Sequence, residues 1–369
     1  MAYATVAKPS AHCEAKTYTG SSSAVSVTGV GFKPDLVITK DRTDAYQWGV
    51  YDSNRGIKRW LKADAGQSEN NNSGASVIDA SLTSFDSAGF TIANMSSDPV
   101  GNKASHYFRS WLWKANGGTT SSNGSGSITS TVQANTTAGM SIVTWAGSGA
   151  NATIGHGLGV APKFIIVKNR TNGRNWGVYH GATEIVTDPQ TDYMELNVAS
   201  GWVDDATYWN DTAPTSTLFS VGTNNSVNEA SCNMVAYCFS QIQGYSHFGT
   251  YWGSDDSADG PMVYCGFRPK IVIIKRTDGN ENWQITDTAC TQIAKDGAAG
   301  RQGNRIEQKI LINSANAENS SSGDLDFYST GFKLRDTDGM HNWTDYKYVY
   351  AAFADHPIVG TNGTVGLAF

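Results

Sequence analysis

Short apolar runs bounded by turn residues dominate the chain. The segments 35–40, 164–168 and 270–275 read DLVITK, FIIVK and KIVIIK, and they are rich in β-branched residues with little alternation of apolar and polar positions. Runs of this length and composition are typical of strands that are covered on both faces. No stretch of ten or more residues carries a convincing helical period, so the pattern predicts strands and little helix.

Two further kinds of strand follow each run. Past a turn rich in Asn, Asp, Gly and Thr comes a short apolar segment that carries a tryptophan, at 47–52, 175–180 and 282–287. Later segments alternate large and small residues, at 107–115, 234–241 and 348–356. Many short strands separated by turns favour a sandwich or jelly-roll-like fold over a βαβ fold. The prediction is therefore an all-β protein.

One spacing occurs three times. In each copy a Gly is followed by Pro after three residues, by Lys after six more and by Trp after eight more. The three sets are Pro34, Lys40 and Trp48; Pro162, Lys168 and Trp176; and Pro269, Lys275 and Trp283. The shift between the first two prolines (162 − 34 = 128) equals that between their tryptophans (176 − 48 = 128). This spacing predicts three tandem β-sandwich units of jelly-roll or lectin-like type.

The repeated residues have a structural interpretation. Proline cannot donate to a strand ladder, so the three prolines are expected at strand beginnings. We interpret these prolines and the three tryptophans as anchors in the separate cores of three units. The three lysines are expected to end a buried strand with their ammonium groups in water.

Composition shifts suggest boundaries between the units. The Gly/Ser/Thr-rich stretch between the first two units has the composition of a flexible linker. The predicted division is an N-terminal arm at 1–14, units at 15–116, 138–243 and 244–358, a linker at 117–137 and a C-terminal tail at 359–369.

Charge and cysteine content narrow the class of protein. The net charge of −6 over 369 residues argues against nucleic acid as the main partner, because such partners need a clustered basic face. No apolar stretch is long enough for membrane insertion, and no signal peptide is indicated. The five cysteines lack zinc-site spacing, so they are expected to be free structural thiols in a protein made in a reducing cytoplasm.

Catalytic signals are weak in this sequence. The seven histidines fall in neither HExxH nor HxH spacing, and the serine in GSGSI (124–128) lies in the predicted linker. His180 stands where the other copies have Asp52 and Asp287, and it is expected to hold an ordinary turn. The possibility of a pair of catalytic carboxylates, as in glycosidases, stays open, because such a pair is defined by its distance in space and not by its spacing in the sequence. We predict a protein that is not an enzyme and binds no cofactor.

Two kinds of segment are candidate binding sites, one acidic and one aromatic. The acidic segments SDDSADG (254–260) and RDTDGM (335–340) lack the full ligand spacing of a calcium loop, so turns are expected there and no metal site. In the segment WVDDATYW (202–209), tryptophans bracket two carboxylates, a combination that suits stacking on and hydrogen bonding to a glycan. The candidate glycan contacts are Trp202, Asp204, Asp205 and Trp209; an ordinary aromatic-lined loop is the alternative.

Several stretches resemble a known family. MAYATVAKPSAHCEAKTYTG, SLTSFDSAGF, GLGVAPKFIIVKNRT, GFRPKIVIIKRTDG and AAFADHPIVGTNG resemble a virion structural protein family of marine tailed bacteriophages, especially those that infect cyanobacteria. The similarity covers essentially all of the chain. It implies a tandem domain of unknown function, with a lectin-like sandwich suspected and no catalytic residues.

The resemblance implies a place on the exterior of a phage particle after synthesis in the host cytoplasm. A tail fibre needs a shaft, and the sequence has neither heptads nor short shaft repeats. A capsid decoration or knob protein is therefore expected, with the major capsid protein or tail proteins as partners and host glycans as a further possibility. The alternative is a tail fibre or receptor-binding protein that recognises host cell-surface polysaccharide; a depolymerase is a distant third.

Overall fold

The computed structural model describes residues 4–70, 81–95, 99–184, 188–291, 305–306, 308–319 and 325–357. Antiparallel strands make up nearly all of its regular structure. Its helices are single turns, namely η1 (Pro9–Ala11), α1 (Ala206–Trp209), α2 (Asn225–Asn228) and η2 (Thr288–Thr291). The all-β prediction is confirmed.

The first group of strands forms two sheets. The larger sheet has the order β1 (Cys13–Thr19), β7 (Tyr107–Trp113), β3 (Leu36–Asp41) and β4 (Gly49–Asp52). The smaller sheet has the order β2 (Val25–Val27), β6 (Gly89–Ile92) and β5 (Leu82–Asp86).

The second group has the widest sheet. It contains β15 (Val203–Asp204), β14 (Asp192–Glu195), β13 (Gly177–His180), β12 (Pro162–Asn169), β17 (Asn233–Ser240), β10 (Met140–Ala146), β9 (Ser130–Asn135) and β8 (Ser121–Asn123), in that order. The smaller sheet of this group pairs β11 (Ala152–Gly155) with β16 (Leu218–Val221).

The third group also has two sheets. The larger one has the order β18 (Ser246–Trp252), β26 (Lys347–Pro357), β20 (Phe267–Arg276), β21 (Gln284–Asp287) and β23 (Ile310–Leu311). The other has the order β19 (Met262–Tyr264), β25 (Gly331–Leu334), β24 (Leu325–Tyr328) and β22 (Arg305–Ile306).

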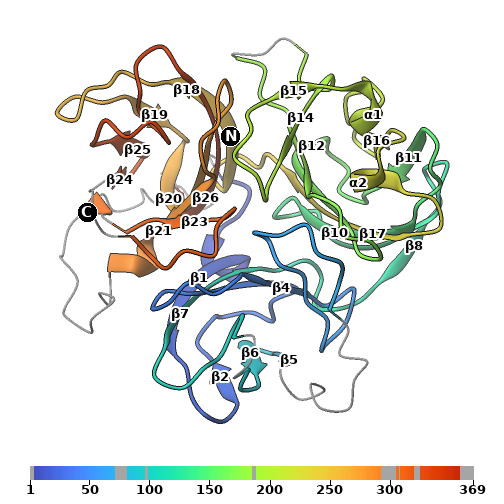
Figure 1. Cartoon of the computed structure of the whole chain (residues 1–369), viewed down its shortest axis with the longest axis horizontal. Helices are drawn as coiled ribbons and strands as arrows, with labels where there is room; N and C mark the ends of the chain where they lie inside the picture. Colours follow the sequence, from blue (N-terminus) through green and yellow to red (C-terminus); the bar gives the residue numbers. More distant parts are fainter. Residues whose placement is uncertain are drawn as a thin grey trace.

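The three large sheets contain the same four-strand arrangement. Its order is β1-β7-β3-β4 in the first group, β10-β17-β12-β13 in the second and β18-β26-β20-β21 in the third. In each arrangement the second strand lies between the first and third strands in antiparallel register. Figure 1 shows the three groups placed about a common centre.

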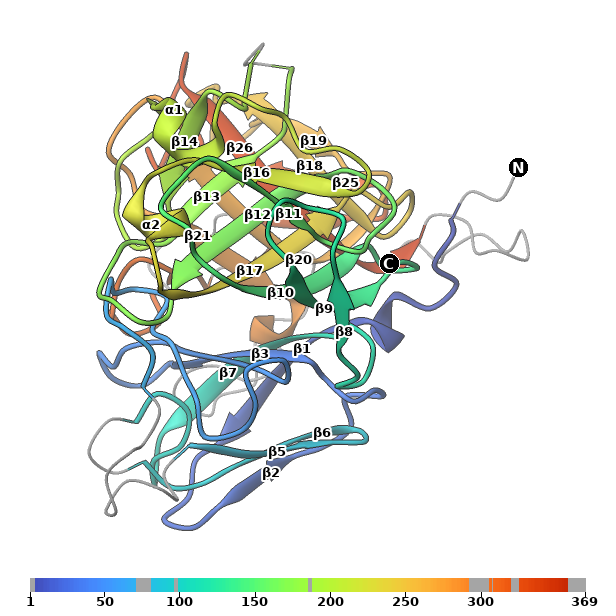
Figure 2. The same ribbon diagram turned by 90° about the vertical axis from the view of Figure 1, so that its right-hand side faces the viewer.

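Each large sheet is buried on both faces. In the first group, Phe90 of β6 packs with Val37 of β3 and Leu112 of β7 in one apolar cluster. The neighbouring residues Leu36 and Trp111 point to the opposite face and join a cluster shared by all three groups. Figure 2 shows β2, β5 and β6 on the outer side of β1, β3 and β7. The prediction of strands covered on both faces is confirmed for β3, β12 and β20.

Three aromatic rings meet at the centre of the shared cluster. The rings belong to Trp113 of β7, Phe239 of β17 and Phe353 of β26. Each ring residue pairs with the third strand of its own arrangement, opposite Leu36, Phe164 and Ile271 respectively. Their ring centroids lie 5.9, 5.3 and 5.4 Å apart, with interplanar angles of 64, 69 and 68°. Edge-to-face pairs in this distance range attract one another. The three central strands are thus joined by a closed ring of aromatic contacts.

A buried asparagine fixes the turn after the first strand of each arrangement. Asn102, Asn228 and Asn342 are inaccessible to solvent. Their side-chain oxygens accept the backbone N–H of Ser21, Ser148 and Ser254 at 2.8, 3.1 and 3.0 Å. The glycines before these serines touch the backbone of the opposing loop, so that a Cβ at Gly20, Gly147 or Gly253 would collide with a carbonyl oxygen.

The stretch predicted to be a flexible linker carries strands. Within 117–137, β8 and β9 pair with each other, and β9 pairs with β10 at the edge of the second large sheet. Its composition suggested flexibility, but the cross-strand hydrogen bonds give the segment a fixed place, so that part of the prediction is wrong. The predicted tail at 359–369 lies outside the described residues, and the other boundaries stay predictions.

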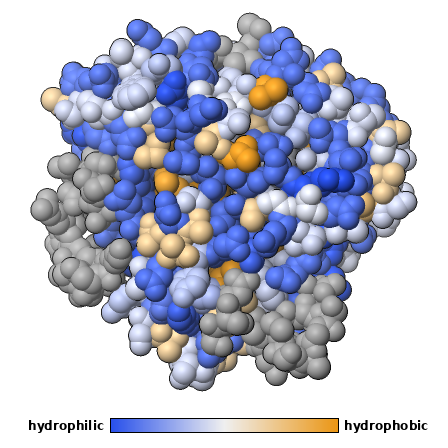
Figure 3. Space-filling model, in the orientation of Figure 1, coloured by the Kyte–Doolittle hydropathy of each residue, from blue (hydrophilic) through white to orange (hydrophobic). Residues whose placement is uncertain are grey.

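The prediction of free, buried thiols is confirmed for four cysteines that the structure describes. Cys13, Cys232, Cys238 and Cys265 are free and buried. Burial raises the thiol pKa of Cys13, Cys238 and Cys265. Among the described residues no helix has the length and apolar character to span a membrane. The face of the molecule in Figure 3 is mostly hydrophilic, with small scattered apolar areas.

Candidate functional site

The repeated tryptophans lie where the groups of sheets meet. Trp48, Trp176 and Trp283 are each 1% exposed and belong to the shared central cluster. Their predicted burial is confirmed. Their predicted placement in three separate cores is wrong, because each indole reaches a neighbouring group. Pro34, Pro162 and Pro269 are buried too: Pro162 begins β12, Pro34 precedes β3 by two residues and Pro269 lies at a register shift in β20.

Each indole N–H donates to a segment that we call a strap. The straps are residues 60–66, 193–199 and 309–315, and each pairs with the fourth strand of its own arrangement, through Val50–Leu61, Val178–Met194 and Ile285–Ile310. Trp176 donates to the carbonyls of Lys62 (2.9 Å) and Ala65 (3.2 Å), and Trp283 to that of Glu195 (2.9 Å). Trp48 donates to the carbonyls of Leu311 (3.2 Å) and Ser314 (3.1 Å).

The repeated lysines bind the same straps. Lys40, Lys168 and Lys275 are fully buried, so the prediction of solvated ammonium groups is wrong. Their Nζ atoms lie 2.9 Å from the carbonyl oxygens of Ala315, Gly66 and Ala199. Burial lowers the pKa of Lys40 to about 8 and the pKa of both Lys168 and Lys275 to about 7.

The direction of these contacts closes a circle. The second group binds the strap of the first, the third binds the strap of the second, and the first binds the strap of the third. Within each group the strap also returns to its own tryptophan, since Asp64, Asn197 and Asn313 accept the backbone N–H of Trp48, Trp176 and Trp283 at 3.2, 2.9 and 3.0 Å. We call each contact between two groups a junction.

Two junctions carry a buried ion pair. Arg170 binds Glu69 at 2.6 Å, and Arg42 binds Glu318 at 2.8 Å. Burial alone would raise the pKa of Glu69, but hydrogen bonds and charge from Arg170 and Arg55 lower it to about 2. At the closing junction Arg109 also binds Glu318, at 2.6 Å.

The third junction replaces the ion pair with uncharged residues. The N–H of Glu69 donates to the carbonyl of Arg170 at 2.8 Å, and the N–H of Trp202 donates to that of Thr277 at the same distance. Trp202 therefore takes the place of the strap-side glutamate, and Thr277 that of the arginine. The junction between the second and third groups is unlike the other two.

His180 is more than a turn residue. Its Nε2 lies 3.0 Å from the carbonyl oxygen of Tyr350 across a junction, and burial lowers its pKa to about 4. The equivalent Asp52 accepts the Tyr237 hydroxyl at 2.7 Å, and Asp287 accepts the Trp111 indole N–H at 2.8 Å. All three positions serve contacts between groups.

The residues proposed as a glycan site do not form one surface. Trp209 is 2% exposed and packs in the core of the second group, so its ring offers no face for stacking. Trp202 is half-buried against the central cluster. Asp205 caps α1 by accepting the N–H of Thr207 at 2.9 Å, and Asp204 lies exposed in β15. The idea that the two tryptophans bracket a sugar is wrong, because α1 directs Trp209 inward.

The acidic segments behave differently from each other. Asp256 accepts the backbone N–H of Ala258 and Asp259, both at 2.8 Å, so the predicted turn in 254–260 is confirmed. In 335–340, Asp336 and Asp338 lie with His341 in a group whose ligand atoms are within 4.8 Å of one another, a geometry able to hold a metal ion.

The chain's own side chains already engage this acidic group. Lys309, which is 3% exposed, donates to Asp338 at 2.6 Å, and Nδ1 of His341 lies 2.9 Å from the side-chain oxygen of Gln284. Nε2 of His341 also contacts Asp336. An ammonium group therefore stands where a cation would be attracted, which favours a structural role.

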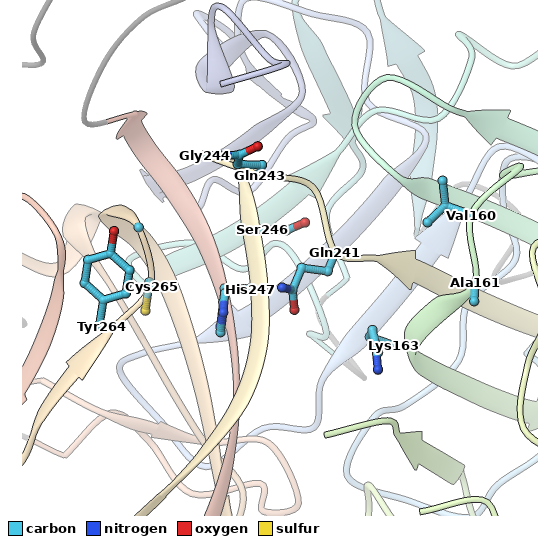
Figure 4. A pocket seen from close by; sticks show the side chains of 11 residues that line it. Val160, Ala161, Lys163, Gln241, Gln243, Gly244, Ser246, His247, Tyr264 and Cys265 are labelled. Atoms are coloured by element: carbon cyan, nitrogen blue, oxygen red, sulfur yellow. The ribbon is translucent and has the colours of Figure 1, made fainter. Parts of the chain in front are cut away.

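A pocket of about 730 Å³ lies beside the connection between the second and third groups. It is lined by Val160, Ala161, Lys163, Gln241, Gln243, Gly244, Ser246, His247, Tyr264, Cys265 and Gly266. Figure 4 shows Tyr264 and Val160 at opposite ends, with His247 and Gln241 between them.

The polar groups of the pocket are largely committed to the fold. Lys163 donates to the carbonyl of Gly181 at 2.9 Å, and the Ser246 hydroxyl donates to that of Ser240 at 3.0 Å. Nδ1 of His247 lies 2.8 Å from the Tyr350 hydroxyl, and burial lowers the pKa of His247, which is therefore neutral at pH 7. The raised pKa of Cys265 keeps its thiol protonated. The pocket therefore offers a ligand a mainly apolar lining.

Sequence reasoning missed the straps and His341. The straps carry one recurring signal, an apolar residue three positions before Asp64, Asn197 and Asn313, but their distance from the tryptophans varies. The sequence does not indicate the role of His341, because the segment before it has the composition of an ordinary turn.

One family model matches the chain over residues 8–357, nearly its whole length, and its description is Domain of unknown function (DUF7483). No curated protein matches the sequence.

Proposed function

Since the chain belongs to the family described as Domain of unknown function (DUF7483), we propose its function from its resemblance to phage virion proteins together with its own architecture. It is a non-enzymatic structural protein on the exterior of a bacteriophage particle. It binds the head as a decoration or knob protein, with the major capsid protein as its partner. The observation that carries this proposal is the closed circle of three junctions about a common aromatic centre.

The proposal includes a threefold duplication of one β-sandwich unit. It is supported by the shared strand order, by the lysine and tryptophan contacts with equivalent strap positions and by the three buried asparagines. Three similar units that bind head to tail close after three steps when each step turns the chain by about a third of a circle. A single chain then has approximate threefold symmetry.

Such symmetry suits a binding place on a symmetric shell. A capsid hexamer has six equivalent subunits about its centre, so three similar surfaces on one chain can each meet equivalent subunits there. The three groups bury their mutual contacts in a common centre and extend loops outward, as a knob does. This geometry differs from that of a fibre, whose subunits wind along a shaft.

The alternative is a tail fibre or receptor-binding protein for host polysaccharide. The exposed aromatic side chains favour it, because Trp252 and Trp343 are 51 and 44% exposed. Exposed aromatic rings serve as platforms for sugars as well as for proteins.

Antibody labelling of intact particles separates the two functions. We expect gold-labelled antibody against this chain to decorate heads, with one chain per hexamer centre in reconstructed particles. Label confined to the tail would support the alternative and refute the head assignment. Particles that carry no label would refute both, and a homotrimer of the chain on a shaft would refute the threefold monomer.

A further inference from the structure

The third group departs from the other two at one end of its large sheet. Trp252 ends β18 where the first and second groups have Thr19 and Ala146, each in register with the first residues of the closing strand. Trp343 follows the buried asparagine of the third group, where the others have Lys103 and Glu229. Both departures introduce a tryptophan.

Two further positions change with them. Arg276 follows the repeated lysine of its group, where the other groups have Asp41 and Asn169. Tyr346 contributes the carbonyl that accepts the N–H of Gly253, the role of His106 in the first group. The three groups carry different residues at all four positions, and the third group is the one that combines three aromatic side chains with an arginine there.

These four side chains come from neighbouring segments at one end of the sheet, and we call them the aromatic patch. The guanidinium carbon of Arg276 lies 3.4 Å from the centroid of the Tyr346 ring and 5.7 Å from that of Trp343. The Trp343 and Tyr346 centroids are 5.8 Å apart. Gly253, which follows Trp252, touches the backbone of Trp343, so the two tryptophans arise from adjacent segments. Lys347 Nζ lies 5.3 Å from the centroid of the Trp252 ring.

The rings are held in place before any ligand arrives. The N–H of Trp343 donates to the Tyr348 hydroxyl at 3.0 Å, and Tyr346 packs on the central cluster. Arg276 is fixed over the rings by Asp278 at 3.1 Å. Rigid rings lose little conformational freedom on binding. Trp252 and Trp343 are nevertheless 51 and 44% exposed, whereas the other two groups have polar or small residues at the equivalent positions.

We propose that the aromatic patch is a saccharide-binding site. The apolar C–H face of a pyranose ring stacks on the exposed faces of Trp252 and Trp343, while sugar hydroxyls bond the ammonium of Lys347 and the carboxylates of Asp278 and Glu281. Amphipathic rings next to polar groups are suited to ligands that are apolar on one face and polar at the edge. The proposal is independent of whether the chain sits on the head or the tail.

A docking site for a protein is the competing occupant, since Trp, Tyr and Arg also dominate protein interfaces. Stable protein interfaces cover roughly 800 Å² on each partner around an apolar centre. Here charged side chains surround the exposed rings: Lys347 lies over Trp252, and Asp278 and Glu281 flank Arg276. Exposed rings that are bordered by charged side chains favour a saccharide over a protein as the ligand.

Affinity electrophoresis of the full-length chain tests the proposal. Native gels would contain dextran, β-glucan, galactomannan, xylan or alginate. We expect at least one polymer to retard the chain, and Trp252→Ala and Trp343→Ala each to weaken that retardation at least tenfold. Trp343→Tyr should retain part of it. The control is Tyr264→Ala, which removes a ring that is 64% exposed beside the pocket and should bind as the unchanged chain does.

Three outcomes would overturn the proposal. These are no retardation by any of the five polymers, full retardation of the Trp252→Ala, Trp343→Ala double variant, or equal loss in the Tyr264→Ala control. Near-ultraviolet circular dichroism of each variant checks that its core is intact. Loss of binding to phage heads by the double variant, without any polymer retardation, would instead identify a protein contact.

Discussion

The aromatic centre offers the sharpest test of how the three groups depend on one another. Phe239 of β17 contacts Trp113 of the first group and Phe353 of the third, at 5.9 and 5.4 Å between centroids. Changing Phe239→Leu keeps an apolar side chain but removes both edge-to-face pairs. Each pair contributes about 0.5–1.5 kcal/mol, and the lost volume adds about 1 kcal/mol, so the variant should lose about 2–4 kcal/mol of stability.

The location of the loss matters more than its size. Native-state hydrogen exchange followed by mass spectrometry reports the opening free energy of separate strands. We expect Phe239→Leu to lower protection in β7, β17 and β26 by similar amounts, although these strands are distant in sequence. The control is Phe219→Leu, an equally buried phenylalanine in the separate core of the second group, where it contacts Trp145 at 5.7 Å.

Phe219→Leu should loosen β11 and β16 first, with a smaller effect on β7 and β26. If Phe239→Leu lowered protection only in β17 and its neighbours in the second group, the groups would be independent. The idea of one shared centre would then be refuted.

Three further changes test the junctions and turns. Lys168→Met should remove a pH dependence of stability, because the pKa of Lys168 is about 7 in the folded chain and about 10.4 in the unfolded chain. Between these two values the unfolded chain binds more protons, so the free energy of unfolding of the unchanged chain rises with pH. Urea denaturation at pH 7, 8 and 9 should show this rise relative to the variant, by up to about 1.4 kcal/mol per pH unit. Glu318→Gln should cost about 3–5 kcal/mol in the same assay, because it leaves buried arginines uncompensated, whereas Glu229→Gln at a more exposed pair should cost less than about 1 kcal/mol. Gly147→Ala forces a Cβ against a carbonyl oxygen and should lower the melting temperature, by about 1–3 °C for a loss of about 1–2 kcal/mol in a chain of this size; an unchanged melting temperature would contradict the close approach.

The sequence was informative wherever a contact has a constant offset. Proline, lysine and tryptophan recur at fixed spacing because they lie on, or directly before, two consecutive strands joined by a turn of constant length. The strap residues that accept hydrogen bonds from the tryptophans do not recur at a fixed spacing. Asp64 follows Trp48 by 16 residues, while Asn197 follows Trp176 by 21 and Asn313 follows Trp283 by 30. Loops of different length hide the straps from any search for a repeat.

Long-range partners explain the wrong predictions for the lysines. A strand-end lysine normally extends to water, and nothing within the local segment contradicts that expectation. Lys40 donates to the nearby carbonyl of Tyr46 and also to that of Ala315, which lies 275 residues away. The same limit applies to Trp209, whose burial depends on how α1 packs against the second group rather than on its own neighbours. Local pattern defined the strands, but contacts between groups decided which side chains are buried.

The unequal junction explains how an architecture of three similar groups of sheets can acquire a specific surface. Replacing a buried ion pair by apolar or neutral residues of similar volume is often neutral for stability, so Trp202 and Thr277 can stand in for the glutamate and arginine of the other junctions without opening the circle. The N–H of Thr277 donates to the carbonyl of Lys347 at 2.9 Å, which places this junction directly beside the aromatic patch. The neighbouring Arg276 lies over the Tyr346 ring within its own group. Two ion-paired junctions keep the circle closed, and the departures from the repeat are concentrated where the third junction permits them.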